Sequence, residues 1–218
     1  MTKVCAVETA RACLGTVEGM PRKRRYETDE GFFHVTTHAI ELLDLYRGDD
    51  ERELFLSILD RVVDKLKLAV HTYVLMTNHY HLLVSTPNAN LADCMHVLNG
   101  EYALWVNKLR KRRGHVFDAR YRPTPVERDE HLLEVLRYVV LNPVRAGMCA
   151  RAEDWPWSAH RALAGLAPAP RFLTTNILGA FHREPGKAQA AYAEFVAAGS
   201  PYASLEGILA LTPSPQAA

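Results

Sequence analysis

Two histidines separated by one residue are the part of this chain whose type and spacing most clearly indicate chemistry. His79 and His81 flank Tyr80, so in an extended strand both imidazoles leave the same face of a sheet. Imidazole is the commonest side-chain metal ligand near neutral pH, and two on one face provide two corners of a coordination site. Such a pair alone is more often structural, so its meaning depends on what lies beside it.

A second candidate lies in residues 129–142, where apolar side chains recur every three to four residues. This spacing is typical of a helix with one buried face. We expect Asp129 to cap the start of the helix and Pro143 to end it at Asn142. Tyr138 and Asn142 are four residues apart, so a phenol and an amide oxygen are neighbours on the last turn. Taken alone, such a pair is more often a tyrosine at the rim of the core and an Asn-Pro helix stop.

The elements that must position these residues alternate in a recognisable order. The order β-α-β-β-α-β-α predicts an α+β fold, namely a ferredoxin-like split βαβ antiparallel sheet with an added C-terminal catalytic helix. Tyr80 must then point away from its flanking histidines, and we expect Trp105 in the core. The expected elements are a strand over 32–38, a helix to Leu66 opened by an Asp50/Glu53 capping box, strands over 70–76 and 79–85, a helix from an Asn90 cap through Leu109 with Gly114 as its stop, and a short strand over 121–127.

Five motifs spread over residues 20–165 carry a family resemblance. Together, and in this order, they resemble the HUH single-tyrosine transposases, in particular the group of REP-associated tyrosine transposases. The motifs are Phe33-His-Val-Thr-Thr37, Tyr73-Val-Leu-Met-Thr-Asn-His-Tyr-His-Leu-Leu83, Gly114-His-Val-Phe117 with Arg120-Tyr121, Arg137-Tyr-Val-Val-Leu-Asn-Pro-Val-Arg-Ala-Gly147, and Trp155-Pro-Trp-Ser158.

The resemblance implies metal-dependent nicking and rejoining of single-stranded DNA through a 5′-phosphotyrosine intermediate, as in transposase-type DNA transposition. It places His79 and His81 as metal ligands, Tyr138 as the nucleophile and Asn142 as the third ligand. Two imidazoles and an amide oxygen suit Mg²⁺ or Mn²⁺ as the cofactor. A phenol is mostly protonated at neutral pH, so it needs a base, a metal or local positive charge to become a good nucleophile.

Basic residues gather in two clusters although the net charge is only +1. A charge run is usually a solvated face, but one cluster lies between the histidine segment and the tyrosine segment, where a groove for DNA phosphates is the better hypothesis. Single-stranded or hairpin DNA is the partner that the family resemblance implies for such a groove. The candidate DNA-binding residues are Arg22, Lys23, Arg24 and Arg25 in the first cluster, and Lys108, Arg110, Lys111, Arg112, Arg113, Arg120 and Arg122 in the second.

Composition is that of an intracellular globular enzyme, with 48% hydrophobic and 23% charged residues. Four scattered cysteines without C-x-x-C pairing indicate reduced thiols in the cytoplasm, and no apolar run is long enough to cross a membrane. We expect a monomer or homodimer with three parts. These are an N-terminal arm over 1–19, a catalytic domain over 20–165, and a C-terminal extension over 166–218 with a helix over 188–198.

Two alternatives remain open. A domesticated DNA-binding protein would keep the fold and the basic groove, and would recognise hairpin or repeat DNA without productive cleavage. A small two-histidine phosphoesterase would use His34-Val-Thr36 as one H-x-T element, but His81-Leu-Leu83 does not supply the second element that this chemistry needs.

Overall fold

The structure is a computed structural model that describes residues 31–41, 43–126, 129–199 and 204–210. The expected arm over 1–19 and the basic cluster of Arg22, Lys23, Arg24 and Arg25 lie outside the described residues. In the part of the chain that is described, no helix has both the length and the apolar character needed to span a membrane.

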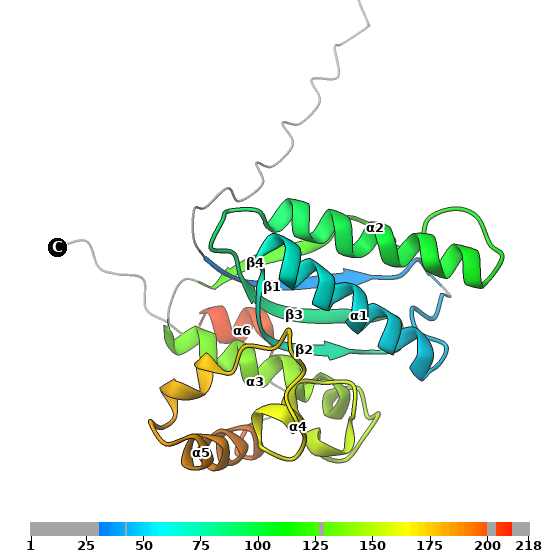
Figure 1. The fold of residues 1–218 in the computed structure, drawn as a ribbon. Helices are drawn as coiled ribbons and strands as arrows, with labels where there is room; N and C mark the ends of the chain where they lie inside the picture. Colours follow the sequence, from blue (N-terminus) through cyan, green and yellow to red (C-terminus); the bar gives the residue numbers. More distant parts are fainter. Residues whose placement is uncertain (1–30, 42, 127–128, 200–203, 211–218) are drawn as a thin grey trace, which may run out of the picture.

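A four-stranded antiparallel sheet forms the centre of the fold (Figure 1). Its order β2-β3-β1-β4 is that of a ferredoxin-like split βαβ sheet, which confirms the predicted fold class. Helices cover both faces of the sheet, so β2 and β3 are buried almost throughout, and the tight Thr77-Asn78 turn, closed by the Met76 N–H to His79 carbonyl bond at 2.9 Å, sets their register. The strands are β1 Phe32–His38, β2 Ala69–Leu75, β3 His79–Ser85 and β4 Arg122–Val126.

Helices α1 (Asp49–Leu66) and α2 (Leu91–Leu109) cover one face of the sheet (Figure 1). An aromatic cluster fills the space beneath them, in which the Phe55 ring lies 4.8 Å from Tyr80 and 5.2 Å from Tyr102. Tyr80 is fully buried in this cluster, so it faces away from the histidines on either side of it, as predicted.

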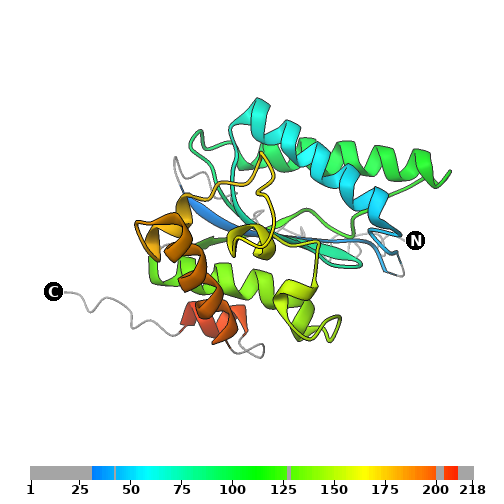
Figure 2. The same cartoon turned by 60° about the horizontal axis from the view of Figure 1, so that its bottom comes forward.

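Helix α3 (Asp129–Arg145) packs on the opposite face, against β2 and β3 (Figures 1 and 2). The C-terminal part of the chain then packs on α3. Arg137 of α3 stacks its guanidinium over Phe195 at 4.3 Å and donates to the Phe195 carbonyl at 3.3 Å. The remaining elements are η1 Ala152–Asp154, α4 His160–Leu163, η2 Asn176–Ala180, α5 Pro185–Ala197 and α6 Leu205–Ala210.

Helix α3 does not end at Asn142, as we had expected, but continues through Pro143 to Arg145. Proline lacks the N–H that would bond to the carbonyl one turn earlier, which belongs to Val139. Asn142 supplies the missing donor, because its side-chain Nδ2 lies 3.3 Å from the Val139 oxygen and 2.9 Å from the Tyr138 oxygen. A side-chain amide therefore lets the helix pass the proline.

Two local expectations on α1 and α2 were wrong, and a third, the Asn90 cap of α2, was right in its position but not in the bond that the side chain makes. Helix α1 begins at Asp49 with Gly48 as its N-cap, and Glu51, rather than an Asp50 capping box, accepts from the Arg47 N–H at 2.7 Å. Asn90 is the N-cap residue of α2, but its Nδ2 donates to the Leu66 carbonyl instead of capping its own helix. Trp105 is 47% exposed and not part of the core.

Candidate functional site

The antiparallel register of β1 and β3 gathers histidines on the face that α3 covers. His38 lies opposite His79, and Thr36 lies opposite His81. Because side chains alternate along a strand, His34 shares that face with them. The rings touch in sequence, with centroids 4.5 Å apart for His38 and His79, 5.0 Å for His79 and His81, and 5.1 Å for His81 and His34. We call this group the histidine face.

Neighbouring polar groups fix which ring nitrogens remain for a ligand. The Nδ1 of His81 lies 3.0 Å from His34 Nε2 and 3.1 Å from Thr36 Oγ1, and the Nδ1 of His79 lies 2.8 Å from Asn78 Oδ1. The Nε2 of His81 is buried and has no hydrogen-bond partner among the described residues. Because buried polar atoms are normally paired, this orphaned nitrogen fits a metal ligand whose other nitrogen is oriented by a second shell of residues. His34 and Thr36 are thereby engaged with His81.

Burial keeps these imidazoles in the form that binds metals. Burial, and then the charge of His38, lowers the pKa of His79 to about 4, and burial lowers the pKa of His34 to about 4 as well. The pKa of His81 lies well below its ordinary value, mainly through burial. Only a neutral imidazole can coordinate a metal, so the histidine face is ready for a cation at neutral pH.

Tyr138 of α3 lies directly against the histidine face. Its ring meets the His34 ring edge-on at 5.8 Å and the His81 ring at 6.1 Å, with interplanar angles of 90° and 87°. The strand pair and the late helix therefore bring His79, His81 and Tyr138 together in one place. This convergence was expected from the sequence.

Asn142 lies one helical turn after Tyr138 and is buried. Its Nδ2 donates to backbone carbonyls of α3, so Oδ1 is the side-chain atom left to coordinate a metal ion. Within the described ranges no group of three His, Cys, Asp or Glu side chains could hold a metal. A ligand set of three protein atoms here would consequently need an oxygen such as that of Asn142.

Arg145 belongs to this site, although the sequence analysis did not select it. Its guanidinium carbon lies 4.5 Å from the centre of the Tyr138 ring, and its Nη1 is buried without a partner in the described structure. The signal was present in the spacing, because Tyr138, Asn142 and Arg145 follow one another at i, i+4 and i+7 on one face of a helix. The expected helix end at Asn142 hid this third position.

The second basic cluster divides into exposed and internal side chains. Arg112 is half-buried and shapes its own loop, because it donates to Asn107 Oδ1 at 3.0 Å and to the His115 carbonyl at 2.9 Å. The residues Lys108, Lys111, Arg113, Arg120 and Arg122 are exposed.

Arg110 is used inside the fold. Its side chain is only 3% exposed, forms an ion pair with Glu51, and donates to the carbonyls of Asp44 and Leu45 at 2.7 and 3.0 Å. Four of its five N–H donors are used within the protein, because Nε and Nη2 also bond to Glu51, so Arg110 is a weaker candidate for DNA binding than the exposed cations of this cluster.

Comparisons with known proteins identify the family and agree with the fold. The family model described as "Transposase IS200 like" matches residues 34–142, which is half of the chain. A solved structure of a REP-associated tyrosine transposase bound to a REP hairpin superimposes with a TM-score of 0.58 at 18% identity, covering 68% of this chain and 89% of that one. A provisionally assigned transposase from Deinococcus radiodurans covers 55% of this chain and 95% of its own at 16% identity, but its TM-score of 0.39 carries no argument. No curated protein matches the sequence.

Proposed function

Because the chain belongs to the IS200-like transposase family, we propose that it nicks and rejoins single-stranded DNA through a 5′-phosphotyrosine intermediate. The observation that carries this proposal is the packing of the Tyr138 ring against both His34 and His81. Because the His79 ring in turn lies 5.0 Å from the His81 ring, the proposed nucleophile and both proposed metal ligands belong to one cluster, where a single phosphate could contact the tyrosine and the metal.

We assign His79, His81 and Asn142 as the residues that would hold a divalent cation, Mg²⁺ or Mn²⁺. When bound, such an ion supplies Lewis-acid polarisation of a phosphate oxygen. The protein prepares the site in advance, because Asn78 orients His79 while His34 and Thr36 orient His81.

In the proposed reaction the Tyr138 oxygen attacks the scissile phosphorus. A bond forms between that oxygen and phosphorus as the bond from phosphorus to the 3′-oxygen breaks. The phenol loses its proton, and the departing 3′-oxygen gains one to become a free 3′-OH. The DNA 5′ end stays on the tyrosine as a phosphodiester, which conserves the bond energy, so attack by a 3′-OH reverses the step and rejoins the strand without ATP.

The decisive experiment is an adduct assay with a labelled hairpin oligonucleotide and Mn²⁺ or Mg²⁺. We expect a protein–DNA species that survives denaturation and disappears with EDTA. Binding without an adduct under every metal condition would instead favour the domesticated DNA-binding protein. Adduct formation that resists EDTA would refute the metal role of His79 and His81.

We also propose that Arg145 binds the scissile phosphate, because its guanidinium lies over the Tyr138 ring and its Nη1 has no hydrogen-bond partner among the described residues. Arg145→Ala should slow adduct formation by about 10²-fold, the usual effect of removing one donor to a developing anion. Replacing the scissile phosphate by an uncharged methylphosphonate should shrink this penalty to a few-fold, since there is less charge left to stabilise. The same loss on both substrates would contradict phosphate contact. Arg151→Ala, at the exposed arginine that directly precedes η1, is the matched control.

The exposed cations of the second cluster supply the proposed contacts to the DNA backbone. Neutralising Lys111 and Arg113 together should reduce the slope of log K against log salt by about 0.7 per lost contact on a single strand. A filter-binding titration over several salt concentrations measures this slope, and Lys187→Gln on the remote helix α5 is the control. An unchanged slope would remove Lys111 and Arg113 from the DNA path.

We propose that residues 20–165 form the catalytic domain and that residues 166–218 are an extension that supports it. The contacts of Arg137 with Phe195 support this role, because they anchor the tyrosine-bearing helix to the tail of the same chain. All side chains of the proposed site then come from one chain, so a monomer is sufficient for the chemistry.

A further inference from the structure

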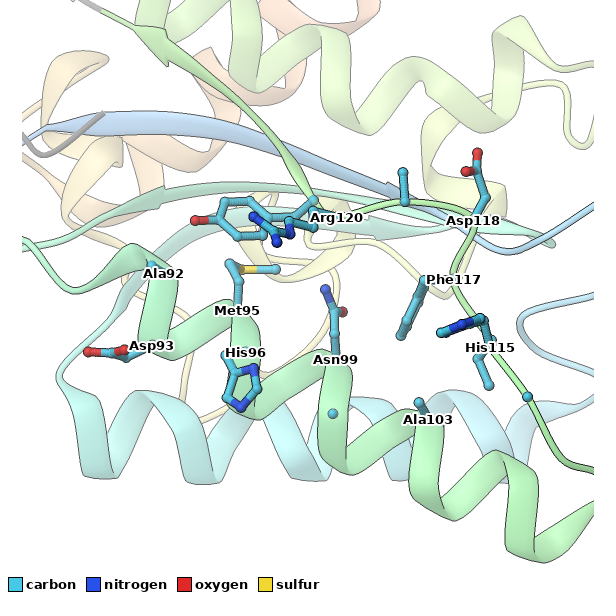
Figure 3. A pocket seen from close by; sticks show the side chains of 15 residues that line it. Ala92, Asp93, Met95, His96, Asn99, Ala103, His115, Phe117, Asp118 and Arg120 are labelled. Carbon is cyan, nitrogen blue, oxygen red and sulfur yellow. The ribbon is translucent and has the colours of Figure 1, made fainter. Parts of the chain in front are cut away.

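A groove of about 690 Å³ opens between α2 and the segment that leads into β4 (Figure 3). We call it the α2 groove. Asn99 and Phe117 face each other across it, from the helix and from the segment respectively (Figure 3). Its lining includes Asp93, Asn99, Gly100 and Ala103 of α2, and Phe117, Asp118 and Arg120 of the segment.

The wall of the α2 groove is joined to the histidine face. The Asp118 N–H donates to the His38 carbonyl at 3.1 Å, and Phe117 forms a β-bridge with Ala39. His38 in turn stacks on His79 of the histidine face. Ala39, which contacts this wall of the groove, is therefore the residue directly after one of the clustered histidines. A DNA chain leaving the proposed scissile phosphate therefore has a short path around this edge of the sheet.

The start of β4 places one guanidinium on each side of that edge. Arg120 lines the α2 groove, whereas Arg122 pairs in register with Thr36 and so lies on the histidine face. Beyond them β4 carries Pro123 and Pro125, which offer no N–H to the outside, so the strand edge is closed to another strand. The edge is thus suited to a nucleic-acid backbone rather than to a β-strand.

Asn99 presents a fixed donor to the α2 groove. Thr37 Oγ1 donates to the Tyr80 hydroxyl at 2.9 Å, and that hydroxyl donates to Asn99 Oδ1 at 2.6 Å. Burial raises the pKa of Tyr80, so the hydroxyl stays protonated and remains a donor. With Oδ1 engaged from below, Nδ2 is the atom of Asn99 left to bind a ligand.

The charges and shapes of the lining residues select the class of ligand. Two carboxylates, of Asp93 and Asp118, line the groove together with one guanidinium, of Arg120, so the charge of its described lining does not favour a phosphate. Gly100 and Ala103 leave space opposite the Phe117 ring, which suits a flat group. A planar, uncharged molecule with a hydrogen-bond acceptor on its edge meets all three conditions, and in DNA that molecule is a nucleobase.

We propose that the α2 groove binds one unpaired nucleobase of the DNA next to the scissile phosphate, with its ring against Phe117 and an acceptor of its edge bonded to Asn99 Nδ2. This inference rests on the proposed function, because it names how that site selects its substrate. A base held in this way fixes the register of the strand, and so decides which phosphate reaches Tyr138.

The test combines protein variants with DNA that lacks one base at a time. Binding is measured without metal in a Tyr138→Phe background, so that no cleavage interferes. Asn99→Ala or Phe117→Ala should weaken binding to intact DNA about tenfold, the usual contribution of one stacked base. Removing the groove-bound base should weaken binding to the parent protein by a similar factor, and with that DNA the two variants should cause no further loss.

If the loss of binding from each variant simply adds to the loss from removing a base, at every DNA position, the proposal is overturned. Leu104→Ala is the control, since Leu104 is 73% exposed on α2 and does not line the groove. If Asn99→Ala fails to fold because it loses the Asn99–Tyr80 hydrogen bond, Phe117→Ala is sufficient to test the proposal. The adduct assay separates failure of this proposal from failure of the proposed function. If the adduct forms but no base removal cancels the effect of the variants, only the groove proposal is refuted. If one base removal cancels their effect but no adduct forms, only the proposed cleavage is refuted.

Discussion

Tyr138→Phe should abolish the covalent protein–DNA adduct while leaving DNA affinity within about twofold of the wild-type value. The substitution removes only the attacking oxygen, and the ring that packs on His34, His81 and Arg145 is retained. Loss of a nucleophile that forms a covalent intermediate costs at least about 10³-fold in rate. The measurement is denaturing electrophoresis of the labelled hairpin with Mn²⁺, beside an equilibrium binding titration.

Tyr102→Phe is the matched control, because Tyr102 lies on the opposite face of the sheet and donates its hydroxyl to the Leu45 carbonyl. It should lose some stability but keep the adduct. An adduct that persists in Tyr138→Phe would move the nucleophile elsewhere. Mixing the inactive Tyr138→Phe and His81→Ala chains should not restore activity, since each proposed site is completed within one chain. Recovery on mixing would show that α3 is exchanged between subunits.

The sheet and the histidine face could be predicted because each depends on short-range rules. Alternation along β3 sends His79 and His81 to one side and Tyr80 to the other, whatever the rest of the chain does. The order of the elements then leaves few ways to place the late helix. Tyr138 reaches the imidazoles because α3 must bury its apolar stripe against β2 and β3.

The features that escaped prediction depend on partners far away in the sequence or on a compensating side chain. Arg110 belongs to a run of basic residues, but it lies inside the protein because Glu51, 59 positions earlier, meets it there. Pro143 predicted a helix end, and only the Asn142 amide, turned back to the carbonyl of Val139, shows why the helix continues. Arg145 was missed for the same reason.

Asn142 combines two roles, a hydrogen bond that lets the helix continue past Pro143 and a proposed bond from its oxygen to a metal ion. Its Nδ2 donates to the Val139 carbonyl, which Pro143 leaves free, and also to the Tyr138 carbonyl, and these bonds turn Oδ1 away from both. An aspartate here could still offer an oxygen to a cation but could not donate to Val139. The amide is thus the side chain of this size that serves both the helix and the proposed metal site.

Acid should destabilise this protein steeply between pH 6.5 and about 4. Burial lowers the pKa of both His34 and His71 to about 4 and that of His81 well below its ordinary value, whereas an unfolded histidine titrates near 6.5. In this window the unfolded chain binds protons that the folded chain does not. Each such histidine then lowers the free energy of unfolding by about 1.4 kcal/mol per pH unit, and its contribution is fully present above pH 6.5.

Urea unfolding at several pH values measures the slope, and His71→Gln tests its origin. His71 lies at the bulge of β2, with its Nε2 2.9 Å from Ser85 Oγ, and takes no part in the proposed catalysis. This variant should lose about 1.4 kcal/mol per pH unit of the slope and keep the adduct at pH 7. A slope equal to that of wild type would show that His71 is not buried neutral. Because His79 and His81 stay neutral through most of the same window, unfolding rather than protonation of the ligands should set the acid limit of activity.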